Sequence, residues 1–251
     1  MNILLSTAGR RTYMVEYFKN ALHGKGLVHA SNNILTYTLL KADKYFISPQ
    51  IYDDNYITAI LNYCIINEIS LVVPLFDIDL PVLAKAKNLF HRYGIKIIVS
   101  DYEVTQICND KWRSFKFLSE IGIKQPESYL SIEDTKIALL ENKIKFPLII
   151  KPRWGMGSIG IHKVFDFEEF NILYRKLRHE IFDTYLKHES SLDKNSCIII
   201  QEVLKGQEYG LEIFNDLNGK YVTTLAKKKV AMRAGETDIA EVIDPSCFEQ
   251  L

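Results

Sequence analysis

A glycine-rich segment between two short apolar stretches places the strongest constraint on how this chain folds. Leu148 to Ile150 reads as a strand and runs into Lys151, three glycines in the spacing GxGxxG follow from Gly155 to Gly160, and Ile161 to Val164 reads as a second strand. Glycine lets a backbone approach a ligand closely and turn its N–H groups toward it. The segment therefore predicts a β-hairpin whose tip, beside a lysine, suits a polyphosphate.

Three familiar glycine motifs do not explain this segment. The dinucleotide-binding GxGxxG opens a helix, whereas a strand follows here. Walker A ends in GK[ST], which this loop lacks. Protein kinases fold a glycine hairpin over phosphates, but the chain contains no HRD or DFG motif. An ordinary flexible hairpin stays open as the alternative, because glycine is common in turns.

Composition excludes several classes of function. The 251 residues contain 31 Lys+Arg and 31 Asp+Glu, so the net charge of +0 gives no reason to expect nucleic-acid binding. No apolar segment is long enough to span a bilayer, and the short apolar start of the chain does not resemble a signal peptide. The four cysteines are far apart, which favours buried thiols in a reducing, cytoplasmic setting over a disulfide framework or zinc site (Cys64, Cys108, Cys197 and Cys247).

The first hundred residues alternate between strand and helix patterns, which predicts a parallel sheet with right-handed crossovers. The expected strands are 3–6, 27–30, 42–47, 71–75 and 96–99, and the expected helices are 13–22, 56–67 and 80–93. An NAD-binding Rossmann unit is disfavoured. The first turn offers only Gly9, and the second strand ends at Asn32 without a carboxylate for the ribose.

Two pairs of charged residues follow strands of this predicted sheet. Arg10 and Arg11 come after the first strand, where open sheets bind ligands, and either meet an acidic group or phosphate or are solvated at the start of a helix. Asp77 and Asp79 come after the strand at 71–75. Capping of the next helix is favoured for these two, and acid/base or metal chemistry is the alternative.

The second half of the chain contains the chemistry. Lys111 begins a helix that stops near Gly122, and together with Lys151 it offers two ammonium groups for different phosphates of one nucleotide. A helix is expected at 165–187, a polar loop at 189–195, and strands at 197–201, 210–214 and 221–226. The lysine run 227–229 follows, either solvated or functional.

At this point the chain resembles the ATP-grasp superfamily, and in particular the stand-alone proteins similar to the carbamoyl-phosphate synthase large subunit. The resemblance rests on five stretches in order: LLSTAGRR, NDKWRSFKFLSEIGIKQPES, FPLIIKPRWGMGSIGIHKV, IIIQEVLKGQEYGLEIF and KKKVAMRAGETD. It implies a mixed α/β and α+β chain. A Rossmann-like pre-ATP-grasp domain (1–106) would precede a lid subdomain with the glycine-rich hairpin (107–204) and part of a second ATP-grasp subdomain (205–251).

The resemblance also implies a function and site residues. Such proteins bind ATP with Mg²⁺ and activate a carboxylate as an acyl phosphate, which an amine then attacks, so a small carboxylate or amine substrate is expected. Two catalytic residues would lie near the transferred phosphate, Lys229 and Arg233. The cofactor-binding residues would be Lys111 and Lys151 at the phosphates, Gly155, Met156, Gly157 and Ser158 over them, Glu202, Val203 and Leu204 at adenine, and Glu208 at the ribose.

One expected part of the family pattern is absent from the sequence. Family members continue into an E-I-N-P-R-like motif that binds magnesium, whereas this sequence stops at Leu251, so the ATP-grasp fold would lack its C-terminal part and no metal ligand is assigned. A homo-oligomer or a partner chain would then cover the strands from Gly210 to Ala226. Two hypotheses stay open: an ATP-dependent ligase, and a non-catalytic nucleotide-binding or assembly module.

Overall fold

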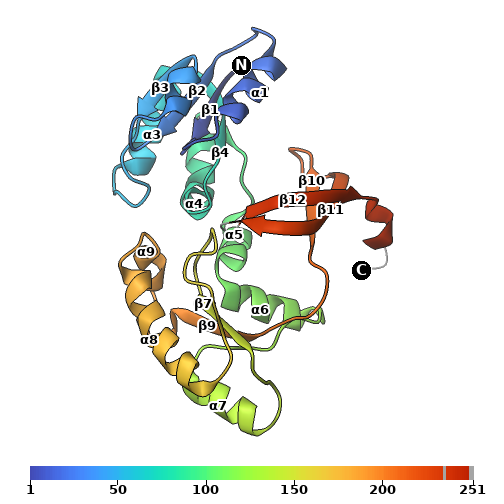
Figure 1. Ribbon diagram of the computed structural model, residues 1–251. Helices are drawn as coiled ribbons and strands as arrows, with labels where there is room; N and C mark the ends of the chain where they lie inside the picture. The colour runs from blue at the N-terminus through green and yellow to red at the C-terminus, as the bar shows by residue number, and fades with distance from the viewer. Residues whose placement is uncertain (234–235, 249–251) are drawn as a thin grey trace. The chain divides into compact units, whose positions relative to one another are not determined.

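The computed structural model describes residues 1–233 and 236–248, and it divides into two compact units, Met1–Asn109 and Asp110–Leu251 (Figure 1). Each unit is described by itself. Ala234 and Gly235 of the KKKVAMRAGETD stretch, and the last three residues, lie outside the described residues. The further division into a lid and a second subdomain at residue 204 stays a prediction.

The first unit is built on a five-stranded parallel sheet in the order β3-β2-β1-β4-β5. The strands are β1 (Asn2–Ser6), β2 (Val28–Asn32), β3 (Lys44–Ile47), β4 (Ile69–Pro74) and β5 (Lys96–Ile97). Every neighbouring pair is parallel, which confirms the predicted sheet. The central strands β1 and β2 are almost wholly buried, because crossover helices cover both faces of a parallel sheet.

Two helices lie against each face of this sheet (Figure 1). One core joins Ile3, Leu5 and Val28 to α1 (Thr12–Leu22) and α2 (Tyr37–Lys41), and the other joins Leu4 and Val72 to α3 (Tyr56–Ile66) and α4 (Asp79–His91). Alternate residues of β1 thus enter opposite cores, as the two-residue period of a strand requires. The unit ends with α5 (Tyr102–Asn109), which packs beside α4.

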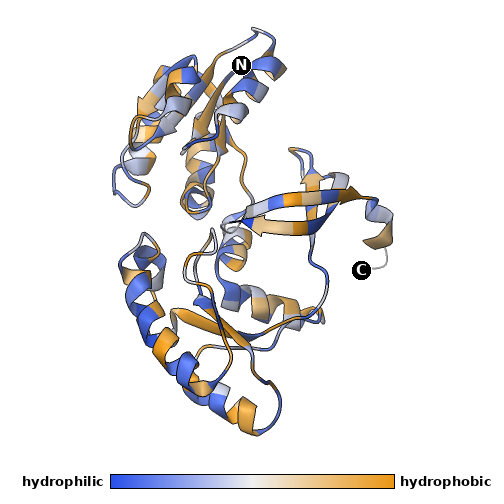
Figure 2. Ribbon diagram, viewed as in Figure 1, coloured by the Kyte–Doolittle hydropathy of each residue, from blue (hydrophilic) through white to orange (hydrophobic). Residues whose placement is uncertain are grey.

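The second unit contains a four-stranded sheet in the order β6-β9-β7-β8. Its strands are β6 (Ser128–Tyr129), β7 (Leu148–Pro152), β8 (His162–Val164) and β9 (Ile198–Glu202). Strands β7 and β8 are antiparallel with Leu148 opposite Val164, so the predicted hairpin is confirmed. The helices α7 (Ile132–Leu140) and α8 (Phe167–Phe182) cover the sheet, with Phe170 and Leu177 fully buried against Leu148 and Ile150. Figure 2 shows the mixed hydrophobic and hydrophilic surface of α8.

A separate three-stranded antiparallel sheet completes the second unit. It consists of β10 (Tyr209–Asn215), β11 (Tyr221–Arg233) and β12 (Glu236–Ile243), followed by the short 3₁₀ helix η2 (Pro245–Phe248). The sequence predicted the first hairpin but not β12, and β11 runs seven residues beyond the expected end at Ala226. Large apolar side chains on this sheet are exposed, for example Ile213 at 65% and Val242 at 81% (Figure 2).

The preferred assignment of Asp79 as a cap is wrong. The residue preceding α4 is Ile78, with no side-chain cap, and Asp79 lies inside the first turn with no exposed surface. Its carboxylate accepts hydrogen bonds from Ser6 Oγ at 2.6 Å, Thr7 Oγ1 at 3.0 Å and Tyr56 Oη at 2.7 Å. Burial raises the pKa of Asp79 against these three donors, which favour the ionised form. The carboxylate therefore joins β1 to α3 and α4.

Several other expectations need correction. The helix expected at 165–187 ends at Phe182, and the expected polar loop contains α9 (Lys187–Ser190) and the 3₁₀ helix η1 (Lys194–Ser196). Glu189 and Ser190 are buried there because the preceding Leu186 anchors the segment in the core. Of the four free cysteines, Cys64 and Cys197 are buried as predicted, whereas Cys108 and Cys247 are exposed. No helix in the described part of the chain is long and apolar enough to cross a bilayer.

Candidate nucleotide site

The two predicted phosphate-binding lysines line one small cavity of the second unit. Lys151 is on β7, and Lys111 is the first residue of α6 (Lys111–Glu120), 40 residues earlier in the chain. The cavity volume is about 20 Å³, which is room for roughly one water molecule. The lining residues are Lys111, Lys151, Pro152, Gly155, Met156, Ser158, Ile159 and Ile161. Four of the predicted loop and lysine contacts are thus brought together beneath the hairpin with Met156; Gly157 is in the same loop but not on this lining.

The Lys111 ammonium is held by carbonyl groups of the segment that follows β7. Its Nζ donates to Gly155 O at 2.8 Å and to Arg153 O at 3.4 Å, and its backbone N–H also donates to Arg153 O, at 3.3 Å. Burial, followed by the positive charge of Lys151, lowers the pKa of Lys111 to about 8. Even so, the ammonium form predominates at pH 7.

Burial also lowers the pKa of Lys151, whose neighbours in the cavity are mainly backbone and apolar groups. Among the described residues, no carboxylate forms an ion pair with Lys111 or Lys151. Two partly buried ammonium groups side by side repel each other, and an anion placed between them would relieve this repulsion. The donor set therefore fits the phosphates of a nucleotide.

The glycines of the loop have different structural roles. A Cβ on Gly160 would lie 2.5 Å from Leu177 Cδ1, and a Cβ on Gly155 would lie 3.1 Å from Pro152 Cβ, so both positions pack tightly against the body of the unit. Gly157, with φ of +61°, has no atom within 4 Å of such a Cβ. Ser158 also has positive φ, +57°. The loop is thus fixed at its two ends and open at its tip.

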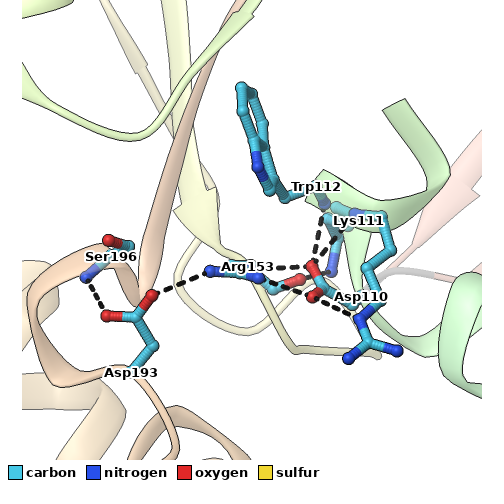
Figure 3. Close-up of polar contacts among 7 residues, drawn as sticks. Asp110, Lys111, Trp112, Arg153, Asp193 and Ser196 are labelled. Atoms are coloured by element: carbon cyan, nitrogen blue, oxygen red, sulfur yellow. Dashed lines mark hydrogen bonds and ion pairs between the residues drawn. The ribbon is translucent and has the colours of Figure 1, made fainter. Parts of the chain in front are cut away.

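A charged network, which the sequence patterns did not predict, fixes the start of α6 (Figure 3). Asp110 caps the helix by accepting from the backbone N–H of Trp112 at 2.9 Å. Arg153 donates to the same carboxylate from Nε at 2.8 Å and from Nη2 at 2.7 Å. Its Nη1 reaches Asp193 Oδ2 at 3.2 Å, and Asp193 in turn accepts from Ser196 N. Arg153 thereby joins α6, the glycine loop and the segment before β9.

The other predicted cofactor-binding residues lie on β9 and on the strand that follows it. Glu202 ends β9, and its Oε1 accepts from the backbone N–H of Glu127 at 3.1 Å, while Val203 is half-buried and Leu204 is exposed. Glu208 precedes β10, and its carboxylate forms an ion pair with Lys229 of β11. A predicted ribose ligand and a predicted catalytic residue are therefore partners of each other in this structure.

The second predicted catalytic residue, Arg233, is exposed at the end of β11, opposite Glu236 of β12. Lys227, from the same lysine run as Lys229, is paired with Glu212, and Lys228 lies 3.8 Å from Glu241. The run 227–229 is thus neither an unpaired solvated cluster nor a free cationic patch. Each of its ammonium groups has a carboxylate partner on a neighbouring strand, because β11 is the central strand of its sheet.

Family models match both halves of the chain. The PylC-like N-terminal domain matches residues 3–98, and the ATP-grasp domain matches residues 144–245, which include the glycine hairpin and all three strands of the last sheet. The chain carries an ATP-grasp domain. Its lysine pair and glycine hairpin are thus elements of the ATP-grasp domain and of the segment just before it.

Individual proteins agree with this assignment. The chain is 30% identical over 127 residues to the carbamoyl phosphate synthase large chain of Thermoanaerobacter sp. (strain X514), covering 50% of this chain and 10% of that protein. It is 27% identical over 150 residues to the D-alanine–D-alanine ligase of Bacillus anthracis, covering 55% of this chain and 44% of that protein.

A solved structure shares the fold over nearly the whole chain. It is the biotin carboxylase domain of the Hydrogenobacter thermophilus 2-oxoglutarate carboxylase, in complex with MgADP, ADP and bicarbonate. It superposes with a TM-score of 0.68 at 16% identity, over 94% of this chain and 51% of that one. The chain thus spans about half or less of the length of each of these proteins.

Proposed function

We propose that this protein binds ATP, with the nucleotide phosphates held between Lys111 and Lys151 and the hairpin loop 153–161 closing over them. The observation that carries this proposal is the pair of partly buried ammonium groups in one cavity without a carboxylate partner among the described residues. Lysine binds phosphate as a point charge, and the backbone of a glycine-rich loop adds N–H donors. Because the cavity accommodates about one water molecule, the loop must lift to admit a phosphate chain.

We further propose that the reaction is ATP-dependent ligation of a small carboxylate to an amine, or a carbamoyl-phosphate-type reaction, through an acyl phosphate. The names of the similar proteins, a carbamoyl phosphate synthase and a D-alanine–D-alanine ligase, support this class. Phosphoryl transfer depends mostly on positioning and on stabilising negative charge. The lysine pair would supply that stabilisation at the phosphates.

The remaining assignments stay predictions with structural consequences. If Glu208 holds the ribose hydroxyls, its ion pair with Lys229 must open or rearrange, which would release the Lys229 ammonium toward the transferred phosphate. Arg233, exposed at the end of the same strand, would serve the same anionic group. Glu202, Val203 and Leu204 would meet adenine through the strand end.

Magnesium would enter with the nucleotide. In the described residues there is no group of three or more His, Cys, Asp or Glu side chains that could hold a metal. Mg²⁺ is commonly bound by one or two carboxylates together with substrate phosphates, so it does not require such a group. When bound, it would neutralise charge on the phosphate oxygens.

Isothermal titration calorimetry with Mg-ATP tests the binding site. Wild type and Lys116→Ala, which changes an exposed lysine on the same helix as Lys111, should bind alike, whereas Lys151→Ala should bind at least tenfold more weakly, about 1.4 kcal/mol. Equal binding by all three proteins would refute the site.

Turnover separates the ligase from the non-catalytic alternative. ADP release would be measured with a panel of amino acids, small carboxylates and amines. Release that depends on both a carboxylate and an amine supports ligation. Tight Mg-ATP binding without release on any pair would support a nucleotide-binding or assembly module instead.

The exposed apolar residues of the β10–β12 sheet favour a covering partner, either a second copy or another chain. Sedimentation at several protein concentrations would detect a second copy. A cytoplasmic setting stays a prediction, supported by four free thiols.

A further inference from the structure

Arg153 differs from the two lysines of the site in its partners. Its side chain is 11% exposed and bonds to two carboxylates, with Asp110 Oδ1 and Oδ2 each accepting one N–H of the guanidinium. A bidentate arginine–carboxylate pair is directional, and the guanidinium stacks on Trp154, 4.2 Å from the ring centre. The guanidinium is therefore committed to the protein itself and is not free for a phosphate.

The same residue also holds Lys111 through its backbone. Arg153 O accepts from Lys111 N at 3.3 Å and from Lys111 Nζ at 3.4 Å, while the Arg153 side chain binds the preceding residue, Asp110. Arg153 N donates to Cys197 O at 2.8 Å, which fixes residue 153 to the segment before β9. Two consecutive residues at the start of α6 are thus fastened to one residue of the loop.

We infer that Arg153 is a positioning residue for the nucleotide: by clamping Asp110, it holds the first turn of α6 so that the Lys111 ammonium points into the phosphate cavity beside Lys151. This inference rests on the proposed ATP binding. It assigns the clamp to a side chain that does not itself touch the ligand. Without the clamp, the Lys111 side chain would sample orientations outside the cavity, and its charge would act on the phosphates from a greater distance.

Substitutions of Arg153 should weaken nucleotide binding through Lys111. Arg153→Gln should lower the affinity for Mg-ATP by about tenfold, the effect typical of residues that orient a ligand-binding group. Arg153→Lys should not restore it, because an ammonium cannot form the two parallel bonds to Asp110. Asp193→Asn is the matched control. It removes the half-exposed outer partner and leaves the Asp110 pair intact, so affinity should stay within about twofold of wild type.

A double-mutant cycle distinguishes positioning from a merely structural role. The affinity for Mg-ATP would be measured for wild type, Lys111→Ala, Arg153→Lys and the double variant, with thermal unfolding of each protein alongside. If Arg153 acts through Lys111, the Arg153→Lys loss disappears in the Lys111→Ala background. An equal loss in both backgrounds, or a wild-type affinity for Arg153→Lys, would overturn the inference. Arg153→Lys retains the charge beside Asp110, so the cycle does not depend on Arg153→Gln folding.

The outcomes separate this inference from the proposed function. If wild type and Lys151→Ala both fail to bind Mg-ATP, the proposed function fails and the inference fails with it. If wild type binds and Lys111→Ala binds weakly, while Arg153→Lys and Arg153→Gln bind like wild type, only the positioning role is refuted.

Discussion

Replacing Lys111 by Met should stabilise the ligand-free protein in a pH-dependent way. The Lys111 pKa falls from 10.5 to about 8, first through burial and then through the nearby Lys151 charge. A tenfold change in proton affinity corresponds to about 1.4 kcal/mol, so the protonated side chain lowers the free energy of unfolding by about 3 kcal/mol relative to the neutral one. Methionine keeps the unbranched shape of the side chain but carries no proton.

The sign of the effect follows from the lowered pKa of the folded state. Below about pH 8 both folded and unfolded chains carry the proton on Lys111, and wild type shows the whole penalty. Between about pH 8 and 10.5 the unfolded chain binds more protons than the folded one, so wild-type stability from this group rises with pH. The advantage of Lys111→Met over wild type should therefore shrink by about 3 kcal/mol across that interval.

Urea unfolding of both proteins at pH 7, 8, 9 and 10 measures this difference directly. Subtracting the two curves removes the titration of groups that the substitution does not affect, and Lys116→Met, at an exposed position of the same helix, controls for the loss of one charge. The hydrogen bonds of Lys111 to Gly155 O and Arg153 O, lost in the variant, reduce the gain at pH 7 without removing its pH dependence. A difference that stays constant from pH 7 to 10 would refute the reasoning.

Three further substitutions test the packing around the site and in the first unit. Asp110→Ala should destabilise by about 3–5 kcal/mol in urea unfolding, because it removes a helix cap and leaves a nearly buried guanidinium without its main partner. Gly160→Ala should destabilise by about 2–3 kcal/mol, whereas Gly157→Ala, with similar positive φ but open space, should cost about 1 kcal/mol; equal losses would contradict the packing argument. Tyr56→Phe should lower the thermal midpoint by an amount equivalent to about 1–2 kcal/mol, because it removes a donor to the buried Asp79 carboxylate, and an unchanged midpoint would count against that bond.

The parts of the fold that depend on local pattern could be predicted from the sequence. The period of apolar residues gave the parallel sheet, because neighbouring strands of such a sheet are buried on both faces. The glycines between two short apolar runs gave the β7–β8 hairpin. The boundaries shifted by one or two residues, as is usual where helices fray and strands end.

The features that depend on contacts distant in sequence could not be predicted in this way. Asp79 resembles a cap by its position before a helix, but the fold encloses it among three hydroxyl groups from other elements, up to 73 residues away. Asp110 lies 43 residues from Arg153, and no periodicity connects them. The one available signal was local: an Asp directly before Lys111 at a helix start is a typical cap, and it marks the carboxylate that Arg153 binds.

The contrast between the cations of the second unit is the strongest argument for their different roles. Arg153 lies in the same region as Lys111 and Lys151, yet it has two carboxylate partners, whereas the lysines have none among the described residues. A paired cation stabilises the folded chain by itself. Unpaired, partly buried ammonium groups reduce stability until an anion arrives, which is the expected compromise where a binding site must keep charge available for its ligand. The nucleotide should therefore stabilise the wild type more than Lys111→Met, and a larger Mg-ATP-induced rise in thermal midpoint for the variant would contradict this division of roles.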